Sequence, residues 1–153
     1  MILADSNVLL RVLQRQHPMH LEAWTAVRIL QARKEIVLAP QNIVELWVVA
    51  TRPKEQNGLG IPPTRAAIYL ARLNRTFPVL LATPGIHQEW QRLVLEYRVS
   101  GKKAHDTRLV AAMRILGVQG IVTFNVTDFR RYAGIDVWHP RDFQQGEMAS
   151  RLP

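Results

Sequence analysis

The sequence predicts an α/β fold, a three-layer α/β/α sandwich on a mostly parallel central sheet. Short apolar runs that suit buried strands alternate with longer segments in which apolar residues recur at helical spacing. This alternation is typical of parallel strands joined by crossover helices, which cover both faces of the sheet. Because 153 residues are enough for one core and too few for two, we expect a single domain over 1–153, with a flexible tail from about residue 144.

The first half of the chain contains two predicted strands, and each is followed by helix. Pro40 suits the first turn of the helix after the second strand, because a backbone N–H is not needed there. Pro53 ends that helix, since proline disfavours the helical conformation in the residue before it. In chain order, the predicted elements are a strand at 2–5, helices at 7–15 and 20–32, a strand at 36–39 and a helix from Pro40 to just before Pro53.

A segment rich in proline and glycine, 53–63, separates this half from the next and predicts a loop. The apolar run at 77–81 predicts a strand, in which Pro78 indicates either the edge of the sheet or the start of the strand. The other elements predicted here are helices at 64–75, 85–98 and 105–116, a strand at 120–123, a short helix at 126–132 and a last strand at 137–138.

The chain is basic, with 20 Lys and Arg against 12 Asp and Glu and a formal net charge of +8. Sixteen of these cations are arginines, whose planar guanidinium groups match the geometry of phosphate. The charge therefore favours a nucleic-acid partner. A solvated surface without an anionic partner explains the charge equally well, because no block of like charges marks a dedicated basic arm.

The composition also excludes several classes of protein. No cysteine is present, which excludes disulfides, thiolate nucleophiles and cysteine–zinc sites. No apolar run reaches the length of a membrane span, and the N-terminus lacks the basic and apolar regions of a signal peptide. We therefore expect a cytoplasmic protein with no membrane association.

Four acidic residues stand in apolar or helix-initiating positions and form the candidate site. Asp5 closes the first predicted strand, and Glu45 lies in the apolar stretch 43–49. Asp106 and Asp128 stand at the starts of two predicted helices in the second half. Because ligands bind outside the carboxyl ends of the strands in open α/β sheets, we expect all four carboxylates along one rim of the fold.

Carboxylates gathered this closely need a cation. Two unit charges about 4 Å apart repel by about 4 kcal/mol at an effective dielectric of about 20, and an all-carboxylate site suits Mg²⁺ or Mn²⁺. Such a cation lowers the pKa of a bound water and polarises phosphoryl oxygens. We expect Asp5 and Asp106 to be the principal ligands, Asp128 to be a further ligand, and Glu45 to bind the metal or to orient the attacking water.

Each of these acids also has a purely structural explanation. Asp5 suits the N-cap of the helix that follows it, and Asp106 in a first helical turn gains ~0.3–1 kcal/mol from the helix dipole. Glu45 can reach solvent or pair with an arginine, and Asp128 completes a capping box that begins at Asn125. The presence of all four on one rim is what favours a metal site.

Other catalytic motifs do not occur in the sequence. The five histidines show neither HxH nor HExxH spacing, and the chain has no GxSxG elbow and no glycine-rich phosphate loop. Trp24, Trp47 and Trp90 fall at helical spacing beside aliphatic residues. We interpret these tryptophans as core residues and not as platforms for stacked bases.

These features together resemble the PIN-domain ribonucleases, and among them the VapC-like toxins of type II toxin–antitoxin systems. Four segments carry the resemblance, keep the order of the family's motifs and extend over nearly the whole chain. They are Leu3-Ala4-Asp5-Ser6-Asn7-Val8-Leu9, then Asn42-Ile43-Val44-Glu45-Leu46 with Ala50-Thr51-Arg52-Pro53, residues 101–113, and Thr123-Phe124-Asn125-Val126-Thr127-Asp128-Phe129.

The resemblance implies a PIN-like fold and a Mg²⁺- or Mn²⁺-dependent endoribonuclease that hydrolyses phosphodiester bonds of single-stranded or structured RNA. It also implies a cognate antitoxin protein as the neutralising partner, and a homodimer. The family's acidic quartet maps onto Asp5, Glu45, Asp106 and Asp128. Its polar groups around the quartet map onto Asn7, Thr123 and Asn125.

Three cations flank Asp106 in the sequence, and they suit contacts with substrate phosphates as well as a solvated surface: Lys102, Lys103 and Arg108. An alternative function is a catalytically weak or inactive PIN module that binds RNA or protein, in which the acids cap helices. A phospho-accepting receiver domain is also α/β with acids on its rim. It needs a second acid beside Asp5 and a lysine after the last core strand, whereas Ser6 follows Asp5 and no lysine comes after residue 103.

Overall fold

The computed structural model describes residues 1–144, so the predicted flexible tail lies outside the described residues. No helix in this part of the chain is long and apolar enough to cross a membrane. In chain order its elements are β1 (Ile2–Ala4), α1 (Ser6–Leu13), α2 (His20–Ala32), β2 (Ile36–Val37), α3 (Pro40–Thr51), η1 (Lys54–Gln56), α4 (Pro63–Thr76), α5 (Pro84–Glu96), α6 (Lys103–Ile115), β3 (Gly120–Val122), α7 (Val126–Phe129), β4 (Asp136–Trp138) and η2 (Pro140–Phe143).

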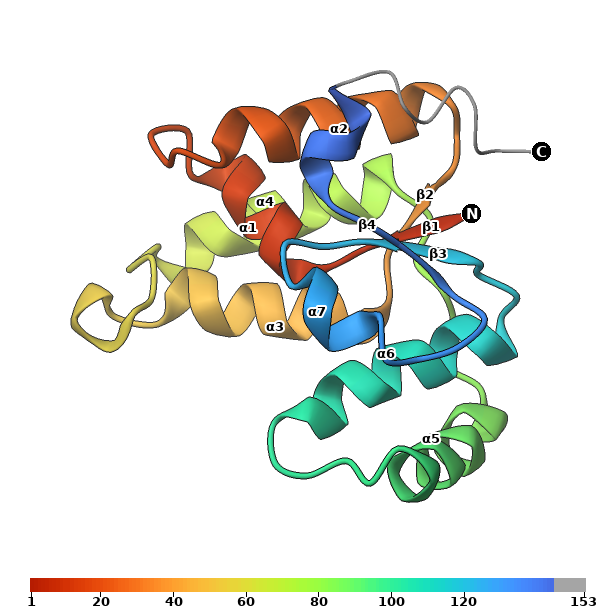
Figure 1. Cartoon of the computed structure of the whole chain (residues 1–153). Helices are drawn as coiled ribbons and strands as arrows, with labels where there is room; N and C mark the ends of the chain where they lie inside the picture. Colours follow the sequence, from red (N-terminus) through yellow and green to blue (C-terminus); the bar gives the residue numbers. More distant parts are fainter. Residues whose placement is uncertain (145–153) are drawn as a thin grey trace.

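The four strands form one parallel sheet in the order β2-β1-β3-β4, which confirms the predicted mostly parallel sheet (Figure 1). β1 lies at the centre, between β2 and β3. Ala4 of β1 pairs with Val122 of β3, so the next residues of the two strands, Asp5 and Thr123, leave the sheet beside each other. The register of the central strands therefore places two polar residues at the carboxyl edge.

The strand predicted at 77–81 is wrong as a regular strand. A single parallel bridge joins Leu38 to Val79, beyond the end of β2. Leu38 N donates to the carbonyl of Pro78 (2.9 Å), and Leu80 N donates to the carbonyl of Leu38 (2.8 Å). Because Pro78 has no N–H with which to extend the ladder, this segment makes a short contact at the edge of the sheet.

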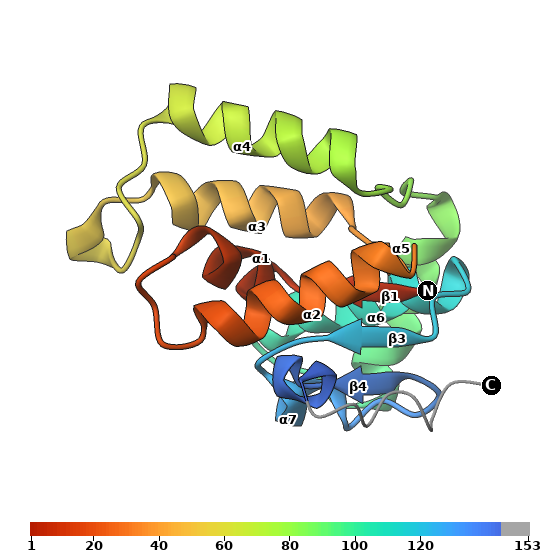
Figure 2. The ribbon, with the colours of Figure 1, turned by 90° about the horizontal axis from the view of Figure 1, so that it is seen from above.

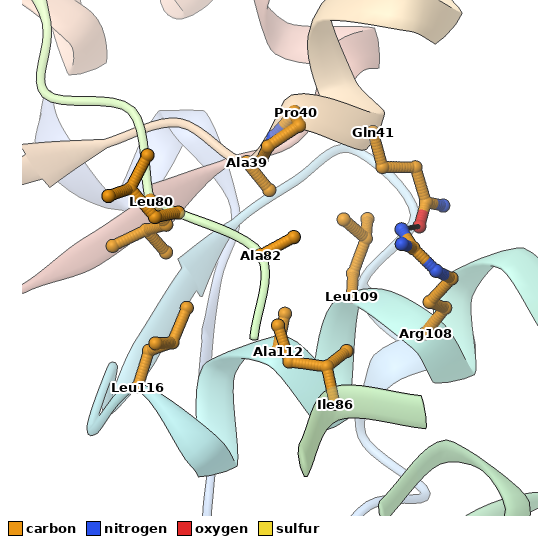
Figure 3. A pocket seen from close by; sticks show the side chains of 11 residues that line it. Ala39, Pro40, Gln41, Leu80, Ala82, Ile86, Arg108, Leu109, Ala112 and Leu116 are labelled. Carbon is orange, nitrogen blue, oxygen red and sulfur yellow. Dashed lines mark hydrogen bonds between the residues drawn. The ribbon is translucent and has the colours of Figure 1, made fainter. Parts of the chain in front are cut away.

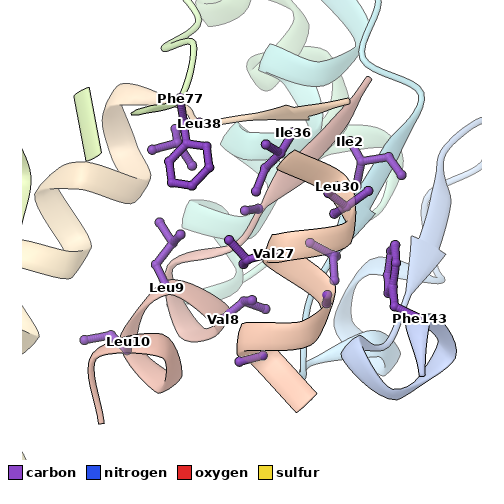
Figure 4. Close-up of a cluster of buried hydrophobic side chains, with 14 of the residues drawn as sticks. Ile2, Val8, Leu9, Leu10, Val27, Leu30, Ile36, Leu38, Phe77 and Phe143 are labelled. Carbon is purple, nitrogen blue, oxygen red and sulfur yellow. The ribbon is translucent and has the colours of Figure 1, made fainter. Parts of the chain in front are cut away.

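Strand side chains alternate between two faces, and helices cover both of them. On one face, Ile2 and Ala4 pack with residues of α1, α2 and α3, and Figure 4 shows this cluster. On the other face, Leu3 packs with residues of α5 and α6. Figure 1 shows these helices on opposite sides of the sheet, and Figure 2 shows α4 beside α3. The period-2 alternation of the strands thus produces the predicted three layers.

Two local features differ from the prediction. α6 begins at Lys103, two residues before its predicted start, and Asp106 lies in its first turn as predicted. Trp24 is not a core residue, because it is 44% exposed on α2 with the guanidinium carbon of Arg28 5.3 Å from its ring centroid. Trp47 is half-buried, and so is Trp90, whose Nε1 donates to a backbone carbonyl of α6 (3.0 Å).

Leu3 occupies the centre of the sheet and is 0% exposed. We expect Leu3→Ala to lower the free energy of unfolding by about 2–5 kcal/mol, because it removes buried apolar atoms and leaves a cavity between β1 and α6. Urea titration monitored by circular dichroism measures this change. Leu95→Ala is the matched control, since Leu95 is 79% exposed and its truncation should change stability by no more than about 0.5 kcal/mol.

Candidate functional site

Asp5 lies at the carboxyl end of β1 and begins α1. Its backbone carbonyl accepts hydrogen bonds from the N–H groups of Val8 (3.0 Å) and Leu9 (3.3 Å), but its side chain makes no capping hydrogen bond. The interpretation of the Asp5 carboxylate as a helix cap is therefore wrong. Asp5 is instead buried, with 6% of its surface exposed, at the edge of the sheet where we expected the site.

Three neighbouring side chains lie within hydrogen-bond distance of the Asp5 carboxylate. Asn7 Nδ2 (2.7 Å) and Thr123 Oγ1 (2.6 Å) donate to Oδ2, and Ser6 Oγ lies 3.2 Å from Oδ1. Burial nevertheless raises the pKa of Asp5 above its ordinary value, and repulsion from Glu45 raises it further, while the hydrogen bond from Thr123 opposes both effects. The fold thus holds a carboxyl group in a place that disfavours its charge.

Glu45 is half-buried on α3, with both carboxylate oxygens hydrogen-bonded. Its Oε2 accepts from Ser6 Oγ (2.7 Å) and its Oε1 from Gln41 Nε2 (2.8 Å). Because the Ser6 hydroxyl has one proton to donate, its shorter contact with Glu45 takes precedence over its contact with Asp5. Two carboxylates therefore share one hydroxyl. Within residues 1–144 Glu45 makes no ion pair, so the alternative of pairing with an arginine is wrong.

Asp106 lies in the first turn of α6 and is half-buried. Its pKa is raised from 3.8 to about 6, first by burial and then by repulsion from Asp5, Asp128 and Glu45, with a small opposing effect of His105. Contacts link the first turn of α6 to two of the other acids, because Gln41 bonds both Glu45 and the His105 carbonyl, and Lys103 pairs with Asp128. Ser6 in turn links Glu45 to Asp5. The four predicted acids, which are far apart in the sequence, are brought together at one edge of the fold.

Asp128 lies in α7, which follows β3, and is half-buried. The capping box predicted from Asn125 does not form, because the Asn125 side chain makes no capping hydrogen bond. The backbone N–H of Asp128 donates to the Asn125 carbonyl (3.1 Å). The Asp128 carboxylate pairs instead with Lys103 Nζ at 3.7 Å, which joins the start of α6 to α7.

The polar residues predicted around the acids occupy different positions. Asn7 Nδ2 also donates to Thr123 Oγ1 (3.1 Å), and its Oδ1 accepts from the backbone N–H of Phe124 (3.2 Å). Thr123 Oγ1 accepts a further hydrogen bond from the Asn125 N–H (2.9 Å). Asn7 and Thr123 thus hold Asp5 directly, whereas Asn125 contributes through its backbone.

The three predicted basic residues also differ from one another in their contacts. Lys102 is exposed, Lys103 pairs with Asp128, and Arg108 Nη1 donates to Gln41 Oε1 (3.1 Å). Of the three cations, Lys103 therefore lies nearest to the carboxylates. It is the first residue of α6.

Two residues of this cluster were missed in the sequence. Ser6 lies between Asp5 and Glu45, and Gln41 joins Glu45 to α6. Ser6 could have been found from its position next to Asp5, and Gln41 from its position one helical turn before Glu45. Their pairing with other elements depends on how the helices pack, which the sequence does not reveal.

The cluster suits a divalent cation in the chemistry of its donors. Its carboxylates supply the oxygen ligands that Mg²⁺ and Mn²⁺ prefer, and the pKa of Asp106 is raised first by burial and then by repulsion from neighbouring carboxylates. In the geometry of residues 1–144, however, no three His, Asp or Glu side chains are arranged as a metal site. The donor types fit the ion, while the hydrogen bonds and the ion pair described above determine where each carboxylate lies.

A model of a known protein family matches most of the chain. The family model described as "PIN domain" matches residues 2–135, a range that contains all four acids. The chain belongs to the PIN domain family. Comparison with curated protein sequences gives no match.

Solved structures share the fold of this PIN domain over most of its length. The toxin–antitoxin complex from Klebsiella pneumoniae has a TM-score of 0.63 and 20% identity, covering 92% of this chain and 98% of that chain. The VapC20 toxin of Mycobacterium tuberculosis, described as cleaving the sarcin–ricin loop, has a TM-score of 0.61 and 20% identity, with 86% and 95% covered. VapBC-1 from nontypeable Haemophilus influenzae has a TM-score of 0.66 and 16% identity, with 92% and 99% covered. At these identities, the likeness establishes the fold.

The raised pKa of Asp106 predicts how the metal-free PIN domain responds to pH. The folded protein holds this proton more tightly than the unfolded chain does, because the pKa rises from 3.8 to about 6 on folding. The contribution to stability is therefore full below about pH 4 and is lost as the pH rises through about 6. We expect Asp106→Asn to be more stable than wild type above about pH 6, with a difference that shrinks towards about pH 4.

Thermal unfolding in chelator across this pH range measures the effect. The matched control is Asp136→Asn, which changes an exposed carboxylate on β4 and should give no such trend. A gain for Asp106→Asn that is independent of pH, or a loss of stability, would contradict the raised pKa of Asp106.

Proposed function

We propose that this PIN domain is a metal-dependent endoribonuclease and the toxin of a toxin–antitoxin pair. The observation that carries the proposal is the set of contacts, through Ser6, Gln41 and Lys103, that links the elements bearing the four acids at the carboxyl edge of a parallel sheet. Such an edge is the usual binding position in open α/β folds. Membership of the PIN domain family supports the same activity.

The cofactor of the proposed enzyme is Mg²⁺ or Mn²⁺. Bound at such a site, the ion activates water and polarises the phosphoryl oxygens of the scissile bond. In our proposal Asp5 and Asp106 are the principal ligands, Asp128 is a further ligand, and Glu45 binds the ion or orients the attacking water. Asn7 and Thr123 hold the Asp5 carboxylate by hydrogen bonds to Oδ2, which leaves Oδ1 with the weaker contact to Ser6.

RNA is the substrate that we propose. The net charge of +8 suits a polyanion, and three exposed cations stand near the acids in the sequence: Lys102, Lys103 and Arg108. The fold neighbour from Mycobacterium tuberculosis is described as a toxin that cleaves the sarcin–ricin loop, which supports RNA cleavage as the activity. Lys103, paired with Asp128 at 3.7 Å, is placed to meet a phosphate that approaches the carboxylates.

A PIN module that binds RNA or protein with weak or no catalysis remains the second candidate. The observation that favours it is the engagement of the acids with other groups, since Glu45 has a hydrogen-bond donor on each oxygen and Asp128 pairs with Lys103. In that case Mg²⁺ would leave the melting temperature unchanged, and RNA would be bound and recovered uncut. The two functions therefore differ in a direct measurement.

Asp5→Asn separates these two functions. We expect the variant to lose Mn²⁺-dependent cleavage of labelled RNA by more than about 100-fold, since even residues behind metal ligands contribute ~10–100-fold. The metal-free variant should melt at a higher temperature than wild type, because burial and repulsion from Glu45 both disfavour the charge of Asp5. The new amide can accept from Asn7 and Thr123 and donate to Ser6, so the hydrogen bonds are kept.

Cleavage assays with Mn²⁺ or chelator, and thermal melts in chelator, make the two measurements. Asp136→Asn serves again as the control for loss of one exposed carboxylate. Retained cleavage in Asp5→Asn would remove Asp5 from the site, and a lower melting temperature in chelator would mean that Asp5 has a structural role.

The proposed antitoxin has a candidate docking groove between α1, α2 and α4. This groove has a volume of about 1320 Å³ and a mixed lining whose apolar residues include Leu9, Val12, Leu73 and Phe77. Four arginines line it and no acidic residue does: Arg15, Arg28, Arg65 and Arg72. An amphipathic segment with acidic residues has the complementary charge and apolar surface. Toxin–antitoxin complexes among the fold neighbours support a partner of this kind.

Charge reversal tests the groove. We expect Arg65→Glu with Arg72→Glu to raise by about tenfold the concentration of the proposed antitoxin that is needed to inhibit RNA cleavage, because like charges at an interface weaken association. Cleavage without antitoxin should stay as in wild type. The control is Arg75→Glu, on the same helix but outside the groove. Equal inhibition of both variants would place the antitoxin elsewhere.

A homodimer completes the proposal. Val44 and Val48 lie one turn apart on α3 and are 62% and 41% exposed, which gives an apolar surface suited to a second copy of the chain. Measurement of the molar mass in solution decides between monomer and dimer.

A further inference from the structure

Gln41 is the second residue of α3, and its side-chain amide makes three hydrogen bonds. Its Nε2 donates to Glu45 Oε1 (2.8 Å) and to the backbone carbonyl of His105 (2.9 Å). Its Oε1 accepts from Arg108 Nη1 (3.1 Å). Figure 3 shows Gln41 and Arg108 facing each other from α3 and α6. One side chain therefore contacts a carboxylate of the proposed site and the first turn of α6.

The chemistry of these partners allows one orientation of the amide. A carboxylate and a backbone carbonyl accept hydrogen bonds, whereas a guanidinium group donates them. Rotating the amide by half a turn would place its oxygen against two acceptors and its NH₂ against a donor. The orientation of Gln41 is thus determined by Glu45, His105 and Arg108 together, and each of its three bonds supports the other two.

This amide connects two helices that otherwise pack elsewhere. The principal packing neighbours of α3 are α1 and α4, and those of α6 are α5 and α7. Throughout residues 1–144, every side-chain hydrogen bond between α3 and α6 involves Gln41. Because His105 directly precedes Asp106, the bond to its carbonyl relates the position of Glu45 to the turn that carries Asp106.

We propose that Gln41 is a positioning residue, whose amide holds the Glu45 carboxylate in fixed relation to the Asp106 turn of α6 across the site. This inference rests on the proposed metal-dependent nuclease function. In this proposal Gln41 contacts neither the metal nor RNA. Its effect acts through Glu45 and α6.

Two hydrogen bonds hold the Glu45 carboxylate, one on each oxygen: Gln41 Nε2 donates to Oε1 and Ser6 Oγ donates to Oε2. As Glu45 is half-buried, its side chain can turn towards solvent if the hydrogen bond to Oε1 is lost. The remaining bond from Ser6 Oγ holds the other oxygen alone, and a single bond restrains the carboxylate less than two do.

Two substitutions of Gln41 test the proposal. Gln41→Ala removes all three hydrogen bonds, and Gln41→Glu keeps an acceptor for Arg108 while losing both donated bonds. We expect both to raise the dissociation constant for Mn²⁺ and to lower kcat by ~10–100-fold, the range found for residues that orient metal ligands. The KM for RNA should stay within about twofold, because Gln41 does not meet the substrate. Titration with Mn²⁺ alone and steady-state cleavage measure these quantities.

Amide hydrogen exchange in the metal-free protein gives a measurement that does not depend on activity. The N–H groups of residues 104–107 in Gln41→Ala should exchange several-fold faster than in wild type, since the first turn of α6 loses its link to α3. Gln91→Ala is the control, because it removes an exposed glutamine on α5 and should leave exchange, Mn²⁺ binding and cleavage as in wild type.

The outcomes distinguish the two proposals. If wild type neither binds Mn²⁺ nor cleaves RNA, the nuclease function is wrong, and the positioning role in that function is wrong with it. If wild type does both and Gln41→Ala matches it in Mn²⁺ affinity, kcat and exchange, the positioning role alone is overturned. A large fall in melting temperature with unchanged Mn²⁺ affinity would make Gln41 a structural residue.

Discussion

Burial of the Asp5 carboxyl group is the constraint on which the rest of the site depends. A carboxylate removed from water is unstable unless other groups compensate for the lost hydration. Here Asn7 and Thr123 donate hydrogen bonds to Oδ2, and the Ser6 hydroxyl lies 3.2 Å from Oδ1. These bonds do not cancel the effects of burial and of Glu45, because the pKa of Asp5 remains raised. The fold therefore maintains a concentration of negative charge at this edge at a cost in stability.

The parallel sheet explains how this concentration arises. β1 and β3 are adjacent, and the pairing of Ala4 with Val122 brings Asp5 next to Thr123. β2 runs parallel on the other side of β1, so the helix that follows it, α3, starts at the same edge and carries Glu45 towards Asp5. α7 follows β3 in the same way and carries Asp128. Parallel strands thus deliver residues from separate parts of the chain to one place.

The hydrogen bonds around the acids separate a functional from a structural explanation. A capping side chain would accept from the second or third N–H of its own helix, yet neither Asp5 nor Asn125, the predicted cap before Asp128, makes a side-chain capping bond. Thr123 instead bonds the Asp5 carboxylate from beyond β3, and Ser6 of α1 joins Asp5 to Glu45 of α3. Charges arranged against one another in this manner are typical of sites that bind a ligand of opposite charge. Ser6 and Gln41 are important in this arrangement because each donates a hydrogen bond to one oxygen of Glu45.

The sequence by itself determined the fold class, most of the elements and the four acids, because these depend on local patterns. Ile2, Leu3 and Ala4 form an apolar strand that Asp5 interrupts, and Pro40 and Pro53 bound α3 through backbone constraints that act on neighbouring residues. Tertiary structure decided what depends on contacts between distant elements. It left 77–81 with a single bridge, exposed Trp24 on α2 and paired Lys103 with Asp128. It also placed Ser6 beside Glu45 and Gln41 beside the His105 carbonyl. Hydrophobic periodicity shows which face of a helix is buried, but the partner of each polar side chain is set by the packing of whole helices.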